Sequence, residues 1–256
     1  MLVYSTESQG GRQYMEDRYV NTSVARNIGF HAIFDGHGGD KIAILCKELF
    51  PNIIEQEIAK APYEIGNAII NSFHKMDQVA ASIEDASHIG STVVFVLVAN
   101  NAIWFANAGD SMSMVGYING SSELKSFEHK VANEEERITQ AGGVVTDDDT
   151  KRINHMLNVS RAIGDFYLKP IVICDPYYTS ISMNFDNIKY ILLASDGIWD
   201  VLSHSTINEI INNSHMWDFT GKEREKYIVE TINYLVMLAQ MRGSTDNITV
   251  TFLMVD

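Results

Sequence analysis

The chain has 256 residues, 46% of them hydrophobic and 20% charged, and this balance excludes disorder as its main state. It carries 33 acidic residues against 19 lysines and arginines. The formal charge of −14 argues against a nucleic-acid partner, which needs a basic face, and against docking by charge onto an anionic membrane. The longest apolar run, Val93–Ala99, is far shorter than the ~20 residues that span a bilayer, and the N-terminus lacks a signal-peptide pattern. We therefore expect a soluble intracellular protein, cytoplasmic or nuclear, with no membrane partner.

The first elements predicted along the chain are a strand and two helices. Phe30–Phe34 reads as a strand because it is dense in apolar and aromatic residues. Apolar residues at i, i+3 and i+4 spacing then predict helices at Lys41–Ala59 and Tyr63–Ala81. Cys46 falls on the apolar face of the first of these helices, which favours a packing role.

A predicted hairpin and a short helix follow. The β-branched runs Ser91–Asn100 and Ala102–Asn107 predict two strands. Between them, Asn100-Asn101 indicates a tight turn, since asparagine tolerates a positive φ. A short helix is expected at Glu134–Ala141, which two glycines end.

The last predicted elements are a strand at Tyr190–Ala194, a helix at Glu223–Arg242 with Gly243 as its C-cap, and a strand at Ile248–Val255. Grouped helices and hairpin-linked strands favour an α+β fold over alternating βαβ units. Without an internal repeat or a low-complexity linker, a single domain over residues 1–256 is expected.

Four acidic residues lie at predicted strand ends. Asp35, Asp110 and Asp196 follow strands, and Asp246 precedes the last one. In antiparallel neighbours the end of one strand lies beside the start of the next, so these carboxylates could meet along one edge of a sheet. Close carboxylates need counter-cations, and Mg²⁺ or Mn²⁺ are suited to oxygen ligands. The alternative is that aspartate simply favours turns.

Two further segments carry candidate chemistry. In the glycine-rich run 35–39, His37 could donate a proton to a leaving group, or it could be a solvated residue of a turn. Arg12 offers a guanidinium suited to a phosphate-like oxyanion, or a surface salt bridge to the neighbouring Glu16 and Asp17.

At this point the residues carry a resemblance to a known family. The chain resembles the metal-dependent protein phosphatases of type 2C, the PPM serine/threonine phosphatases. The matching stretches run in the family's order across nearly the whole chain: GGRQYMED at 10–17, FDGHGG at 34–39, GSTVV at 90–94, ANAGDS at 106–111, ERITQAGGVV at 136–145, NVSRAIGD at 158–165, LLASDGIWDVLS at 192–203 and STDNITV at 244–250.

The resemblance implies a four-layer αββα sandwich of two mostly antiparallel sheets flanked by helix pairs. It also implies two Mn²⁺ or Mg²⁺ ions per chain at one end of the sandwich. By motif, Asp35 would bridge both ions, the Gly36 carbonyl would bind the first, and Asp196 and Asp246 the second. The remaining implied metal-site residues are Glu16 and Asp17, directly or through water, and Asp110, which would help hold a weaker third ion with Asp196 and, as a further candidate, Asp200.

The implied activity is hydrolysis of phosphoserine and phosphothreonine in protein substrates by a monomeric enzyme. A hydroxide between the two metals would attack phosphorus, with Arg12 binding the phosphate and His37 as candidate general acid. Residues 131–165 would form a flap beside the site. Neither Cys46 nor Cys174 lies in a phosphate-loop sequence, so both are expected to be packing residues.

Some residues depart from the family pattern. Met112 stands where the family usually has arginine, and His155 where it usually has glycine. The family's Asp-His-x-Pro reads Glu-His-Lys-Val at 128–131. None of these removes an expected ligand of the two central metals, so activity is predicted. Few residues precede Arg12, as expected of a catalytic domain alone or of a piece trimmed from a longer chain.

Two other functions stay open at this stage. Met112 and His155 would suit a phosphatase fold that binds a partner without turnover, although the intact acidic set counts against that reading. A phosphatase of small metabolites could use the same centre. Phosphate release from peptides, nucleotides and sugar phosphates separates the three readings.

Overall fold

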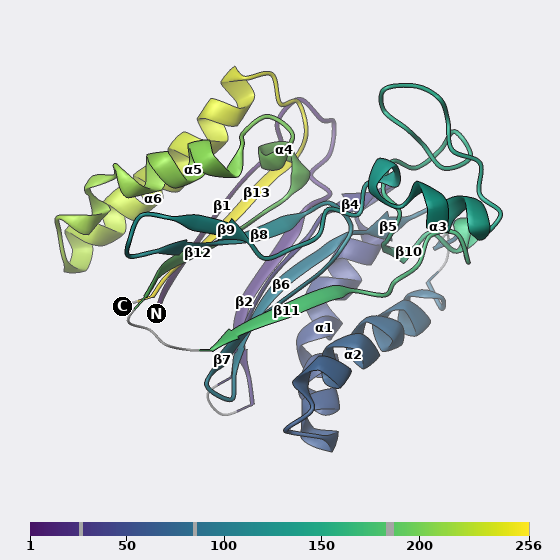
Figure 1. The fold of residues 1–256 in the computed structure, drawn as a ribbon, viewed down its shortest axis with the longest axis horizontal. Helices are drawn as coiled ribbons and strands as arrows, with labels where there is room; N and C mark the ends of the chain where they lie inside the picture. The colour runs from purple at the N-terminus through teal and green to yellow at the C-terminus, as the bar shows by residue number, and fades with distance from the viewer. Residues whose placement is uncertain (26–27, 84–85, 183–186, 256) are drawn as a thin grey trace.

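The computed structural model describes residues 1–25, 28–83, 86–182 and 187–255, and Figure 1 shows their arrangement. The strands are β1 (Leu2–Ser8), β2 (Arg18–Val24), β3 (Ile28–Phe34), β4 (Gly36–His37), β5 (Gly90–Ser91), β6 (Val93–Ala99), β7 (Ala102–Ala108), β8 (Met112–Tyr117), β9 (Ser122–Leu124), β10 (Ile163–Gly164), β11 (Tyr177–Ser182), β12 (Ile188–Ala194) and β13 (Ile248–Met254). The helices are α1 (Lys41–Lys60), α2 (Ile65–Ala80), α3 (Glu135–Gln140), α4 (Asp196–Trp199), α5 (His204–Asn212) and α6 (Gly221–Met241), with 3₁₀ turns η1 (Val131–Asn133), η2 (Phe166–Leu168) and η3 (His215–Trp217).

Two five-stranded antiparallel sheets form the centre of the molecule. One has the order β1-β13-β12-β8-β9 and the other β11-β7-β6-β3-β2. A small third sheet, β10-β5-β4, lies at one end of the sandwich. Because β1 pairs with β13 from Leu2↔Met254 onward, the two termini lie together at the opposite end (Figure 1).

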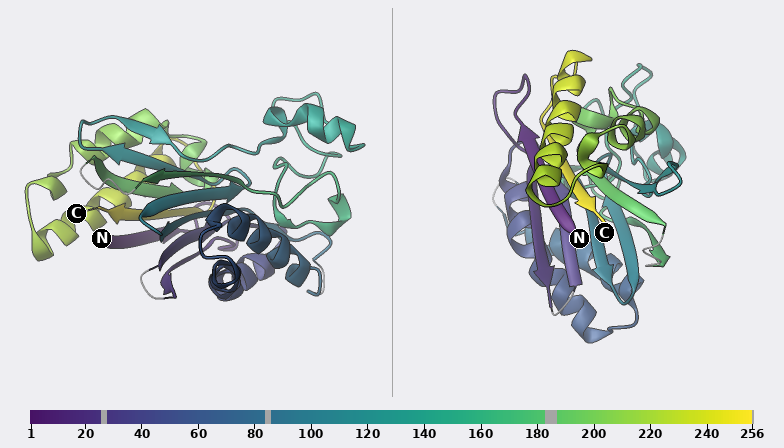
Figure 2. Two further views of the ribbon diagram at one scale, coloured as in Figure 1. Left: turned by 60° about the horizontal axis from the view of Figure 1, so that its bottom comes forward. Right: turned by 90° about the vertical axis from the view of Figure 1, so that its left-hand side faces the viewer.

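A helix pair covers the outer face of each large sheet (Figure 2). Helices α1 and α2 bury their apolar faces against the β11-β7-β6-β3-β2 sheet, and α5 and α6 do the same on the other sheet. A third apolar cluster, which includes Ile33, Phe105 and Leu193, fills the space between the sheets. The predicted α+β class and the αββα layering are confirmed.

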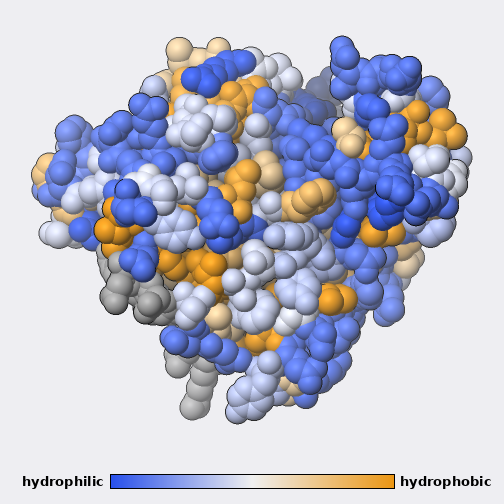
Figure 3. Space-filling view, in the orientation of Figure 1, coloured by the Kyte–Doolittle hydropathy of each residue, from blue (hydrophilic) through white to orange (hydrophobic). Residues whose placement is uncertain are grey.

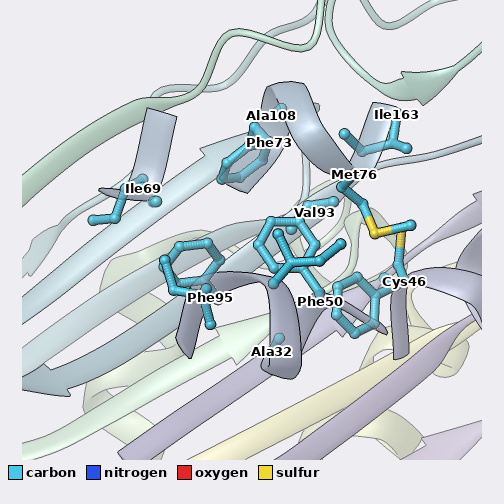
Figure 4. Packing of buried hydrophobic residues seen from close by; sticks show 14 of the residues in the cluster. Ala32, Cys46, Phe50, Ile69, Phe73, Met76, Val93, Phe95, Ala108 and Ile163 are labelled. Atoms are coloured by element: carbon cyan, nitrogen blue, oxygen red, sulfur yellow. The ribbon is translucent and has the colours of Figure 1, made fainter. Parts of the chain in front are cut away.

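Aromatic rings form the centre of the cluster beneath α1 and α2 (Figure 4). The ring centroid of Phe50 lies 5.2 Å from that of Phe73 and 5.7 Å from that of Phe95, in edge-on contacts. Each such buried side chain contributes about 1.5–3 kcal/mol to folding through lost apolar exposure. Cys46 is fully buried in the same cluster beside Met76, and Cys174 packs against its margin, as predicted for both cysteines.

The predicted strands and helices are all present, with ends shifted by a few residues. Asn100 and Asn101 both have positive φ (50° and 58°), which makes the predicted tight turn, and Gly243 follows α6 with a φ of 96°. Four longer strands were not predicted as such, namely β1, β2, β8 and β11. β1 and β11 are rich in Ser, Thr and Tyr and only partly buried, so their apolar signal is weak.

The flap has an apolar core of its own. It packs Val131, Ile138 and Ile153 against Leu168 and Val172, so the folded unit runs past the predicted limit at residue 165. Helix α3 and its neighbouring loops form this unit next to the small sheet (Figure 1). Two cationic side chains, Arg137 and Arg161, anchor the flap by pairing with the partly buried Glu134.

A tight turn at Asn154-His155 closes a hairpin of the flap. Both residues have positive φ (50° and 63°), and the Met156 N–H donates to the Ile153 carbonyl at 2.9 Å. This is a type I′ turn, whose second central position favours glycine. His155 therefore carries the strain of a left-handed φ at a position where the family usually has glycine, which adopts this φ without strain.

His155→Gly should raise the free energy of unfolding by about 0.5–1 kcal/mol, because a left-handed φ costs an L-residue ~1–2 kcal/mol and glycine's extra chain entropy offsets part of that gain. Urea unfolding would measure it. Asn154→Gly is the matched control and should bring no gain, since the Asn154 side chain accepts a hydrogen bond from the Val144 N–H at 2.9 Å. An unchanged or lower midpoint for His155→Gly would contradict the strain.

The face seen in Figure 3 is mostly hydrophilic, with apolar side chains in separate small groups. Such scattered apolar exposure is normal for a folded surface. In the described part of the chain, no helix has both the length and the apolarity to cross a lipid bilayer.

Candidate active site

Acidic residues meet at the end of the sandwich that carries the small sheet. In one large sheet the end of β12 pairs with the start of β13 (Ala194↔Val250), which brings Asp196 near Asp246. In the other, the start of β6 lies between the ends of β3 and β7, which brings Asp35 near Asp110. The acids therefore meet between the ends of two stacked sheets, and the expectation of a single sheet edge is corrected.

Asp35, Asp110 and Asp196 form the centre of the group. Each offers a carboxylate oxygen, and these atoms all lie within 4.8 Å of one another. Burial and the neighbouring negative charges raise the pKa of Asp35 and of Asp196 well above its usual range. Burial likewise raises the pKa of Asp110 to about 6, although the Lys130 ammonium opposes this shift. The arrangement favours either protons or cations between the carboxylates.

Asp17 lies fully buried beneath this centre. Its Oδ2 accepts hydrogen bonds from the hydroxyls of Ser195 (2.9 Å) and Thr249 (2.8 Å), while burial raises its pKa to about 6. Within the described ranges, neither Asp17 Oδ1 nor Asp110 Oδ2 has a hydrogen-bond partner although both atoms are buried. Unpartnered buried carboxylate oxygens and an all-oxygen donor set fit hard divalent cations such as Mn²⁺ or Mg²⁺.

Arg12 reaches the site from the loop between β1 and β2. Its guanidinium donates to Asp246 Oδ2 at 2.5 Å, and its side chain is 56% exposed. Gly10 must lack a side chain, because a Cβ there would lie 2.0 Å from the Asp246 carbonyl oxygen. Asn247 fixes the same loop by accepting from the Glu16 N–H and by donating to the carbonyls of Gln9 and Tyr14. The loop is thus held with Arg12 at the cavity.

His37 lies on β4 of the small sheet, immediately after Asp35 and Gly36. Its Nε2 is 2.7 Å from Asp165 Oδ2. Burial lowers the pKa of His37, but the neighbouring acids Asp165, Asp110 and Glu16 together raise it by more, so the net shift is upward. His37 is therefore not the solvated turn residue of the alternative interpretation, since its ring contacts a buried acid.

Asp200 pairs with a lysine near Asp110. Lys130 Nζ lies 2.5 Å from Asp200 Oδ1 and 3.1 Å from Glu128 Oε1. The run 128–131, which departs from the family pattern, therefore places the Lys130 ammonium in the region where the resemblance implies a third metal. Met112, another of the departures, is buried on β8 opposite Ala194.

One cavity of about 370 Å³ unites the predicted residues. It is lined by Arg12, Glu16, Asp35, Gly36, His37, Asp110, Asp196 and Asp246. Asp17 contacts the site from below, so all nine predicted residues are brought together. Arg152 and residues 156–159 of the flap form part of the wall, which makes the flap a boundary of the cavity.

Some residues that contact the predicted site residues received no role from the sequence analysis. Ser195, Thr249 and Asn247 support Asp17 and the Arg12 loop, and Asp165 supports His37. Each lies inside one of the matching stretches, which was the available signal. Their roles depend on contacts between stretches far apart in the chain, and no local pattern shows these.

Comparison with known proteins shows which sequences the chain resembles. The sequence profile described as Protein phosphatase 2C matches residues 2–248. The chain is 32% identical over 252 residues to "Probable protein phosphatase 2C 8" of Oryza sativa subsp. japonica, covering 87% of this chain and 61% of the rice protein. It is 32% identical to "Protein phosphatase 2C homolog 2" of Saccharomyces cerevisiae, covering 80% of this chain and 48% of the yeast protein. The chain thus spans about half to two thirds of these relatives.

Solved structures share the fold. The crystal structure of serine-threonine phosphatase 2C from Toxoplasma gondii superposes with a TM-score of 0.81 at 20% identity, covering 99% of this chain and 94% of that one. At this identity the likeness establishes the fold alone. Because the family profile covers nearly the whole sequence, the chain belongs to the protein phosphatase 2C family.

Proposed function

We propose that this chain is a Mn²⁺- or Mg²⁺-dependent phosphatase of phosphoserine and phosphothreonine in proteins. The observation that carries the proposal is the approach of the Asp35, Asp110 and Asp196 carboxylate oxygens to within 4.8 Å in a cavity that Arg12 also lines. Like charges at this distance need cations, and bound cations together with the Arg12 guanidinium would suit a phosphate dianion. Family membership supports the same reaction class.

The proposed metal-holding residues are those that the family's motifs assign, and they lie around or beside the cavity. Asp35 lies at the centre of the acidic group and would contact two ions, with the Gly36 carbonyl beside it. Asp196 and Asp246 would hold the second ion, and Glu16 and Asp17 would act directly or through water. Asp110 would help hold a weaker third. When bound, two such ions supply an activated water and offset charge on the phosphoryl oxygens.

Two other side chains would act on the substrate. Arg12 can turn its exposed guanidinium from Asp246 to the phosphoryl oxygens and so orient the phosphate. His37 would give a proton to the serine or threonine oxygen as it leaves phosphorus. The flap residues Arg152 and Met156 would face the protein part of the substrate, because they form the outer wall of the cavity.

The test is phosphate release from a phosphothreonine peptide with Mn²⁺, with Mg²⁺ and with EDTA, by the wild type and by Asp196→Ala. Turnover that needs metal and is lost in the variant is expected. Faster turnover of nucleotides or sugar phosphates than of peptides would move the assignment to a metabolite phosphatase. No turnover of any phosphate ester by folded, metal-binding protein would contradict the proposal and favour a binding module.

A further inference from the structure

We propose that Asp165 is a positioning residue that orients His37 for proton donation to the leaving oxygen. This inference rests on the proposed phosphatase function and deepens it, since it assigns a role to a residue of the flap's base. It rests on three structural features. The two side chains are in short contact, the small sheet brings them together, and the burial of Asp165 excludes competing partners.

The contact joins side chains 128 residues apart. His37 Nε2 and Asp165 Oδ2 are 2.7 Å apart, the distance of a charge-assisted hydrogen bond. The Asp165 side chain is 6% exposed and that of His37 is 26% exposed, so the histidine is the more accessible of the two residues, both of which line the cavity. A surface ion pair would leave both groups exposed, and this pair does not.

The small sheet brings the two side chains together across a glycine. Its strands pair His37 with Gly90, and Gly90 with Gly164, the residue before Asp165. A Cβ on Gly90 would lie 2.2 Å from Asp165 Oδ2 and 2.4 Å from His37 Nε2. Glycine at this position therefore leaves the space in which the hydrogen bond forms.

The backbone of Asp165 is fixed in an uncommon conformation. Its φ of 51° is left-handed, which costs an L-residue energy unless the surroundings impose it. Its N–H donates to the Ile89 carbonyl at 3.1 Å, and its carbonyl accepts from the Leu168 N–H at 2.8 Å. The Gly164 N–H donates to Asp77 Oδ1 at 2.9 Å. These bonds aim the carboxylate at His37.

The geometry assigns different tasks to the two ring nitrogens. Asp165 accepts the Nε2–H, which fixes the ring plane and leaves Nδ1 to face the leaving group. In the protonated ring, the Nδ1–H bond breaks and its electron pair stays on nitrogen. The proton forms the O–H bond of the serine or threonine product as the P–O bond breaks, and the Nε2–H stays on the ring, hydrogen-bonded to Asp165.

Two substrates that differ in their leaving group test the assignment. A threonine alkoxide needs a proton when it leaves, whereas p-nitrophenolate leaves readily without one. With Mn²⁺ present, Asp165→Ala should lower kcat on a phosphothreonine peptide about 100-fold, at the lower end of general acid catalysis, and lower kcat on p-nitrophenyl phosphate less than about 3-fold. His37→Ala should show the same split, and the double variant should lose no more than His37→Ala alone.

The controls separate positioning from folding. Asp165→Asn keeps the shape and an oxygen acceptor, so it should retain more peptide activity than Asp165→Ala. Asp175→Ala removes an exposed contact of similar length, His74 Nε2 to Asp175 Oδ1 at 2.8 Å, and should leave kcat on both substrates unchanged.

Equal losses of kcat on both substrates in both Asp165 variants would show a structural role and overturn the proposal. An unchanged kcat on the peptide in Asp165→Ala would also overturn it. If His37→Ala lowers kcat equally on the peptide and on p-nitrophenyl phosphate, the proton donor is another group. The proposal then fails while the phosphatase function stands. A wild type inactive toward both substrates would instead remove the proposed function itself.

Discussion

Asp35→Asn and Asp196→Asn should each lower phosphate release from a phosphothreonine peptide by about 1000-fold or more. Each change removes a negative charge from the carboxylate group whose oxygens approach within 4.8 Å. A bound divalent cation contributes several kcal/mol to the reaction, and each 1.36 kcal/mol corresponds to tenfold in rate, so weakened metal binding has a large effect. Steady-state kinetics at saturating Mn²⁺ would measure it.

The matched control is Asp147→Asn in the exposed flap loop, which makes the same chemical change away from the cavity and should leave kcat within about twofold. The two site variants should stay folded, because the amide carries no charge to repel its neighbours. Full activity in folded Asp35→Asn would show that the acidic group is not the working centre.

Asp110→Asn should make the metal-free protein more stable than the wild type near neutral pH. The folded-state pKa of Asp110 is raised from 3.8 to about 6, chiefly by burial. Between these values the folded protein keeps a proton that the unfolded chain has lost, so this contribution to stability is present below about pH 4 and is lost as the pH rises past 6. For one group the loss is about 3 kcal/mol.

The prediction is best measured as a difference between two proteins. Wild type and Asp110→Asn, both in EDTA, should have similar free energies of unfolding below about pH 4, and the variant should gain up to about pH 6 and keep its advantage at pH 7.5. Burial lowers the pKa of His31 and of His129 to about 4, so these groups change the stability in the opposite direction over the same range. Because both proteins contain them, the difference cancels their effect.

Mn²⁺ should reverse the order at pH 7.5. The ionised wild-type cluster would bind the ion more tightly than the variant, and a ligand at about 1,000 times its Kd adds about 4.1 kcal/mol to stability, more than the ~3 kcal/mol that the ionised Asp110 costs. In thermal unfolding, each kcal/mol moves the midpoint of a protein of this size by about 2–4 °C. A stability difference independent of pH, or equal stabilisation of both proteins by Mn²⁺, would contradict the electrostatic account.

The elements with strong apolar patterns were predictable from sequence. Val93–Ala99 is almost wholly buried, so its continuous apolar run shows directly as a strand. The turn at Asn100-Asn101 was also readable, because asparagine is among the few residues that accept a left-handed φ. Strands such as β11, exposed along much of its length, give no such pattern, and pairing with β7 decides their structure.

The candidate site, like the fold, was predictable from the sequence only in part. The aspartates after strands predicted the acidic group that the structure brings together, and the motifs of the 2C family added Arg12, Glu16 and Asp17 to it. That the acids come from two sheets could not be read from spacing, since sheet stacking depends on packing across the sandwich. The His37–Asp165 contact was equally hidden, because it depends on the small sheet that aligns Gly90 with both strands.

The most direct test of the acidic centre is anomalous X-ray diffraction from crystals soaked with Mn²⁺, recorded at the manganese edge. Two anomalous peaks are predicted in the cavity, one of them flanked by Asp35 and Asp196, with carboxylate oxygens at about 2.1 Å. Peaks only on the surface, or a cavity without manganese at millimolar concentration, would contradict the claim that this carboxylate group is a metal centre.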